Sequence, residues 1–300
     1  MATYRWRIEF SLPGAPIARP VTLGAIQLSP ASRDEHGHSR SVGHLMLDTD
    51  QCLDDSAVTK EALPKLETVA IAAAALGSSV RAPVITSVRL ENRADLESAG
   101  VRTPLENASL VVTYDVLAGD IDGTALATGY QATLDLAGQD ASLWPRAVRW
   151  LWKANSDADP HDQFLALWIA FNVLYGPYKI KGTSEPGAIQ AYLAQALPTD
   201  VDAEKLLARV LSEDLSLLGA SGLTSQANEL QAALGLPAAQ QARHTLVALV
   251  FLVIYAVRCY IIHEGGVAAI PRDKEIPLVR VGGRVLKTAI VHLLRRRLGV

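Results

Sequence analysis

A chain of 300 residues is long enough for two domains of ordinary size. Hydrophobic residues make up 49% of it and charged residues 20%, as in a soluble globular protein with a core of its own. The formal net charge of −3 excludes a protein that binds nucleic acid over its whole surface, although a local basic patch is compatible with it. Only Cys52 and Cys259 are present, which excludes a disulfide framework and a zinc site built from cysteines alone.

The composition also indicates where the protein works. The N-terminal sequence MATYRWRIEF becomes polar at once and lacks the apolar stretch of a secretory signal, so we expect a cytoplasmic protein. Arginine outnumbers lysine twenty to eight and alanine is abundant, which favours a GC-rich bacterial source.

The first part of the chain, 1–130, is predicted to be an α+β domain. Tyr4, Trp6, Ile8 and Phe10 alternate with polar residues, the period-two pattern of a strand with one buried face. Polar residues without a clear period between 29 and 55 predict a long loop. Other elements predicted here are strands within 21–28, 84–90 and 110–116 and an alanine-rich helix over 60–76.

Beyond the glycine punctuation at 119–123 and Gly138 the spacing becomes helical, and 138–300 is predicted to be an all-α helical bundle. Asp162 is expected near the start of a helix that ends at Gly176-Pro177. Further helices are predicted over 186–197, 201–218, 225–234, 239–263 and 283–298.

Two groups of residues have chemical potential but fit structural roles better. His36, His38, His44, Asp48, Asp50 and Cys52 are all zinc-ligand types, yet their spacing matches no metal motif, so we expect a solvated loop and no metal or other cofactor. An aromatic set could stack on bases, but its helical spacing among aliphatic residues is typical of a core. The set is Trp144, Trp150, Trp152, Trp168, Phe171 and Tyr175.

The C-terminal segment is strongly basic. From Arg272 onward, eight basic residues stand against two acidic ones. Such asymmetry is what a phosphate-contacting surface requires, and Arg295, Arg296 and Arg297 are candidate contacts to RNA phosphates. A solvated helix face explains the run equally well.

The most apolar stretch, 246–262, is interrupted by Arg258 and followed by His263 and two glycines. A charge inside such a helix has to reach water, a counter-charge or a bound anion. The polar flanks favour a buried soluble helix over a membrane span. Five residues turn an ideal helix by about 500°, so the pair lies roughly 140° apart unless the last turn loosens or a second subunit completes the site.

In these residues the chain resembles HEPN domains (higher eukaryotes and prokaryotes nucleotide-binding). Their hallmark is Arg-x4-6-His near the end of a late apolar helix, followed by glycine, and YAVRCYIIHEGG is similar to it. The segment LWPRAVRWLWKANSDADPHDQFLALWIAFNVLYGPY also looks like the opening helix pair of the Apea-like branch. The resemblance spans 138–300 loosely and 246–266 closely. One departure is Cys259, because active members usually have a more polar residue directly after the arginine.

The resemblance implies a four-to-five-helix bundle that dimerises through the 239–263 helix and acts as a metal-independent endoribonuclease in bacterial defence or stress control. His263 would move protons while the RNA 2′-OH attacks the adjacent phosphate, and Arg258 would bind the phosphate oxygens. The first domain would recognise a target, a protein partner or an inhibitor. The alternatives are a non-catalytic RNA- or protein-binding module and a protein anchored to a membrane by 246–262. Arg258 and His263 also have a purely structural interpretation, in which the arginine pairs with an interior carboxylate and the histidine caps the helix.

Overall fold

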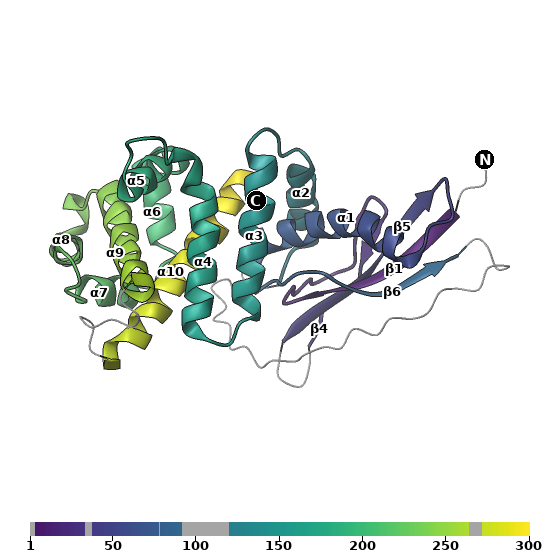
Figure 1. Ribbon diagram of the computed structural model, residues 1–300, viewed down its shortest axis with the longest axis horizontal. Helices are drawn as coiled ribbons and strands as arrows, with labels where there is room; N and C mark the ends of the chain where they lie inside the picture. Colours follow the sequence, from purple (N-terminus) through teal and green to yellow (C-terminus); the bar gives the residue numbers. More distant parts are fainter. Residues whose placement is uncertain (1–3, 34–37, 78, 92–119, 264–271) are drawn as a thin grey trace. The chain divides into compact units, whose positions relative to one another are not determined.

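The protein is described from a computed structural model over residues 4–33, 38–77, 79–91, 120–263 and 272–300 (Figure 1). It divides into two compact units. Unit 1 comprises Met1–Val148 together with Leu294–Val300, and unit 2 comprises Arg149–Leu293. An N-terminal antiparallel sheet is followed by a mostly helical region, as the sequence predicts.

Unit 1 is built on an antiparallel sheet in which β1 (Tyr4–Pro13) lies between β5 (Ser39–Thr49) and β6 (Val84–Leu90). The order of the described strands is β2-β3-β5-β1-β6, and β4 pairs with β5. The predicted alternation is confirmed, because Trp6, Ile8 and Phe10 are buried on one face. The remaining strands are β2 (Val21–Leu23), β3 (Ile26–Leu28) and β4 (Ser32–Arg33).

The predicted loop over 29–55 is wrong, because β5 occupies much of it and pairs with β1, β3 and β4. Two of its inward-facing residues, Ser41 and Thr49, are polar, and this hides the alternation from a hydrophobicity pattern. Both are satisfied inside the fold. The Ser41 hydroxyl donates to the Ala15 carbonyl at 2.7 Å, and the Trp6 indole donates to the Thr49 hydroxyl at 3.2 Å.

The alanine-rich helix α1 (Asp55–Leu76) confirms the helix expected over 60–76 and starts earlier, where Asp54 caps it by accepting from the Ala57 amide at 2.7 Å. Helix α2 (Gly123–Leu134) packs on α1, with Gly129 against Ala72. The boundary expected between 130 and 138 covers the last turn of α2 and the connection that follows, both within unit 1. The strand expected over 110–116 lies outside the described residues.

The helical region follows the predicted order (Figure 1). The start of α4, with Asp162 in its first turn, and its end at Gly176 are confirmed. The helices are α3 (Asp140–Ser156), α4 (Pro160–Tyr175), α5 (Glu185–Ala196), α6 (Asp200–Leu207), α7 (Ser212–Gly219), α8 (Ser225–Leu234), α9 (Arg243–His263) and α10 (Arg272–Leu298).

Two helix predictions need correction. The helix expected over 201–218 is divided into α6 and α7, and the division puts the buried Asp214 in the first turn of α7, where it accepts from the Arg284 Nε at 3.0 Å. The last helix begins at Arg272 and not at 283. Its glycines do not mark a helix start: a Cβ on Gly282 would lie 2.8 Å from the Phe164 ring, so the glycine allows close helix packing.

Helix α9 is the central element of unit 2 and contacts α5, α6, α7 and α8. Of the predicted aromatic core, Trp168, Phe171 and Tyr175 of α4 are buried, and Phe171 stacks on Phe251 of α9 at 4.6 Å between ring centroids. Over Arg243–Ile262, α9 is the one helix of the described part that is long and apolar enough to cross a membrane. Half of that window is buried within the protein.

The turn after β1 provides a stability test. Gly14 has φ +75°, and a Cβ there would collide with the backbone oxygen of Ser79. Gly24 also has a positive φ (+60°) but open space around it. We expect Gly14→Ala to lower the free energy of unfolding by about 2–4 kcal/mol, because it adds a backbone clash to the φ penalty, and Gly24→Ala by only about 1 kcal/mol. Urea denaturation of both variants measures the difference, and equal costs would contradict the packing at Gly14.

A second stability test concerns His244, near the start of α9. Its Nδ1 lies 2.7 Å from Asp200 Oδ1 and its Nε2 lies 2.6 Å from the Leu197 carbonyl. Only the imidazolium donates to both. The backbone acceptor, and next to it the Asp200 carboxylate, therefore raise the pKa of His244 above its usual value, against the effect of burial.

Because the folded pKa of His244 is raised, its stabilisation is complete below about pH 6.5, the unfolded value, and is lost as pH rises through the higher folded value. We expect the thermal midpoint of the wild type to fall over that window more than that of His244→Gln. Asp200→Asn, which keeps the Leu197 bond, should show an intermediate loss. If the thermal midpoints of all three proteins changed with pH in the same way, the two hydrogen bonds of His244 would be ruled out as the source of the effect.

Candidate functional site

Arg258 lies on α9, one turn and a half before the end of the helix, and its side chain is half-buried. Its Nη1 donates weakly to the Cys259 sulfur at 3.9 Å, whereas its Nε is buried without a hydrogen-bond partner. Within the described residues no carboxylate lies at ion-pair distance from the guanidinium, so the pairing with an interior carboxylate is not found there. The Arg258 Nε is therefore unused among the described residues but shielded from solvent, so an anion would have to bind the guanidinium through its terminal nitrogens.

Two tyrosines flank Arg258. Tyr255 precedes it by one turn on α9 and Tyr175 is the last residue of α4; their rings lie 5.9 and 6.0 Å from Trp168 between centroids. A hydrogen bond with the Cys259 thiol, followed by burial, raises the pKa of Tyr255 to about 12. Burial, followed by a hydrogen bond to Glu185, raises the pKa of Tyr175. The charge of Arg258 acts against both shifts, so both phenols lie in its field.

Glu185, the first residue of α5, is the carboxylate next to this cluster. Its Oε1 accepts from the Tyr175 hydroxyl at 2.5 Å, and its Oε2 lies 3.5 Å from the Lys179 ammonium. The Glu185 side chain is only 15% exposed, while that of Lys179 is 47% exposed. Its negative charge is thus shared between Tyr175 and Lys179 and is stabilised by the positive end of α5.

His263 is the last residue of α9, and its side chain lies outside the described part of the structure. The helix is continuous up to it, so its last turn does not loosen before His263. An uninterrupted helix places Arg258 and His263 about 140° apart around the axis, whereas Cys259 and His263 are only about 40° apart. One copy of the chain therefore does not put Arg258 and His263 on the same face of α9.

The three candidate phosphate contacts Arg295, Arg296 and Arg297 lie in the last turn of α10, in unit 1. The Arg297 Nε is 2.6 Å from an Asp140 carboxylate oxygen, and the Arg295 Nε donates to the Val300 carbonyl at 3.4 Å. At least two of the three thus take part in contacts within unit 1, whereas Arg258 belongs to unit 2.

Sequence reasoning missed Glu185, Lys179 and Tyr255. Tyr175 was expected as core, and it is, but its hydroxyl also joins it to the polar cluster. The signal for Lys179 and Glu185 was the polar segment KIKG shortly after the Gly-Pro that ends α4, together with an acidic residue opening the next helix, whereas nothing in the sequence marked Tyr255.

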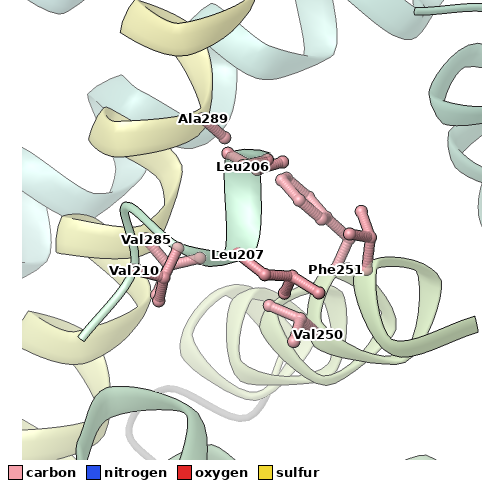
Figure 2. A pocket seen from close by; sticks show the side chains of 8 residues that line it. Leu206, Leu207, Val210, Val250, Phe251, Val285 and Ala289 are labelled. Carbon is pink, nitrogen blue, oxygen red and sulfur yellow. The ribbon is translucent and has the colours of Figure 1, made fainter. Parts of the chain in front are cut away.

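The described residues offer no candidate metal centre, and the hollow described in unit 2 is apolar. No group of three His, Cys, Asp or Glu side chains able to hold a metal ion is found among them. Figure 2 shows a hollow between α6, α9 and α10 with an empty volume of about 200 Å³, open solvent included. Its lining is aliphatic apart from Phe251, so it supplies no chemistry.

Comparisons of the chain with protein-family models, with curated proteins and with solved structures return no match. The HEPN resemblance therefore stays a prediction, and it rests on the residues of α9 and their surroundings. What the geometry adds is a half-buried guanidinium with unused donors, two phenols and a shared carboxylate at one end of a helical unit.

The Tyr175–Glu185 bond can be tested by stability. Tyr175 is fully buried and donates to a charged acceptor, so Tyr175→Phe should cost about 1.5–3 kcal/mol of unfolding free energy. The matched control is Tyr178→Phe, since Tyr178 donates to the neutral side chain of Gln195 at a more exposed position, and about 0.5–1.5 kcal/mol is expected. Chemical denaturation compares the two, and a smaller loss for Tyr175→Phe would contradict the assignment.

Proposed function

We propose that unit 2 is a HEPN-type domain and that the protein is a cytoplasmic, metal-independent endoribonuclease acting as a dimer, in bacterial defence or stress control. The observation that carries the proposal is Arg258. It is a half-buried guanidinium with a buried, unpartnered Nε and no carboxylate partner among the described residues. An RNA phosphate supplies the charge and the planar acceptor pair that such a group lacks.

The reaction follows from the two residue types. The imidazole of His263 takes the proton of an RNA 2′-OH, whose oxygen attacks the adjacent phosphorus, and the bond from phosphorus to the 5′-oxygen breaks. A proton passes to that leaving oxygen, so the products are a 2′,3′-cyclic phosphate and a 5′-hydroxyl. The Arg258 guanidinium binds the non-bridging oxygens, where negative charge grows in the transition state.

A dimer is part of the proposal because of the separation of about 140° between Arg258 and His263 on a regular helix. A second copy of α9 facing the first would bring the His263 of one chain to the Arg258 of the other. Helix α9 has a stripe suited to this contact. Its members are uncharged and at least partly exposed: Thr245, Ala248, Leu252, Tyr255, Cys259 and Ile262.

The second candidate function is a non-catalytic module that binds RNA or protein. The same separation favours it, since a single copy has the phosphate-binding arginine without a histidine beside it. Cys259 favours it as well, because its thiol is a poor donor and is already bonded to Tyr255. Unit 1 would serve either function by recognising a target, a partner or an inhibitor.

Cleavage of single-stranded RNA by the full chain tests the proposal. We expect cleavage that persists in EDTA, falls by about 10²–10³-fold in Arg258→Ala because a transition-state donor is lost, and disappears in His263→Ala. His44→Ala, in the sheet of unit 1, is the matched histidine control and should cleave normally. Binding that depends on Arg258 without any cleavage would establish the binding module instead.

Subunit mixing tests the dimer in the same assay. If each site takes Arg258 from one chain and His263 from its partner, mixing the inactive Arg258→Ala and His263→Ala proteins creates one intact site in every mixed dimer. About a quarter of wild-type activity should return, since about half of the dimers are mixed and each has one intact site of two. No recovery after demonstrated subunit exchange would place both residues of a site in one chain.

A further inference from the structure

The loop between α4 and α5, residues 176–184, begins and ends at the Arg258 cluster. Tyr175 comes directly before it and Glu185 directly after it, and these two side chains are joined by the 2.5 Å hydrogen bond. The base of the loop lies beside the Arg258 segment of α9, because Tyr175 and Tyr255 both pack on Trp168, at 6.0 and 5.9 Å between ring centroids, and Tyr255 precedes Arg258 by one helical turn. The loop is therefore closed at its base beside the guanidinium.

The loop is held in place by its own first residues. Gly176–Tyr178 form a short 3-10 helix, and the Tyr178 hydroxyl donates to Gln195 of α5. The Tyr178 ring packs edge-on against Tyr192 of the same helix, with 5.6 Å between centroids. These anchors hold the following residues at the surface of unit 2 and next to α5.

The tip of the loop is Lys179-Ile180-Lys181-Gly182. Both lysines are exposed, Ile180 is 68% exposed, and Gly182 has φ +89° with open space where a Cβ would be. Two cations with an apolar side chain between them suit a nucleic acid, since the ammonium groups contact phosphates and an aliphatic side chain packs on an unstacked base. An exposed isoleucine has no stabilising role of its own in the fold.

We propose that this tip is the surface along which a single-stranded RNA extends from Arg258, with Lys179 and Lys181 contacting phosphates that neighbour the one bound by Arg258. The inference rests on the proposed function and adds to it the segment that holds the flanking nucleotides. Glu185 would compete with the RNA for one of these cations, because its carboxylate lies 3.5 Å from the Lys179 ammonium.

The salt dependence of RNA binding tests the proposal. Binding of a fluorescein-labelled single-stranded RNA to the full chain is measured between 50 and about 300 mM salt, with the His263→Ala substitution present in every protein so that the RNA stays intact. Each lost phosphate contact reduces the slope of log K against log salt by about 0.7 for a single strand. We expect this reduction for Lys181→Ala and none for Lys205→Ala, an exposed lysine of α6 in the same unit.

Glu185→Gln is the opposing variant. It removes the charge that holds Lys179 while keeping the size of the side chain, so affinity for the RNA should rise severalfold, an outcome that a damaged fold does not produce. An unchanged slope in Lys181→Ala, with binding still weakened in Arg258→Ala, would overturn the role of the loop and leave the proposed function in place. Absence of any RNA binding in the parent protein would overturn both.

Discussion

The packing of unit 2 is governed by the apolar surface of α9, which has to be buried by the surrounding helices. This helix of 21 residues has almost no polar side chains between its first turn and Arg258, and such a surface cannot remain in water. Helices α5, α6, α7 and α8 contact it, and the aromatic side chains of α4 stack against Phe251 and Tyr255. Each fully buried leucine, valine or phenylalanine contributes about 1.5–3 kcal/mol, so the burial of α9 is a large source of stability in this unit.

The enclosure of α9 also determines where a charge can be accommodated. Arg258 lies where the burial of α9 falls, since the residues from Arg258 to Ile261 are half-buried whereas most earlier ones are buried, and a long side chain there can keep its charge near water. Tyr175, which ends α4, and Glu185, which begins α5, are joined by a hydrogen bond across the connection between the two helices. The polar cluster of Arg258, Tyr175 and Glu185 therefore forms where the ends of α9, α4 and α5 meet.

Much of this arrangement could be predicted from the sequence. Period-two and helical spacing identified β1, β6, α1, α4 and α9, because in each of them one kind of side chain marks the buried face. Prediction failed where that marking is absent. In β5 the buried positions include Ser41 and Thr49, whose hydroxyl groups are satisfied by partners far away in sequence. In α10, Gly282 is explained only by its contact with Phe164, which no local pattern reveals.

Only part of the candidate site could be predicted from the sequence. Arg258 stands out because it is a charge in an apolar run, and its position at the edge of the aromatic core agrees with that reasoning. Glu185 and Lys179 could not be linked to it from sequence, since more than 70 residues separate them from Arg258 and only the packing of α4 and α5 brings them near. Nor does sequence show that Glu185 is already shared by Tyr175 and Lys179. That sharing is decisive for the chemistry, because a carboxylate free to pair with Arg258 would neutralise the guanidinium, whereas one held by a phenol and an ammonium leaves it able to bind an anion.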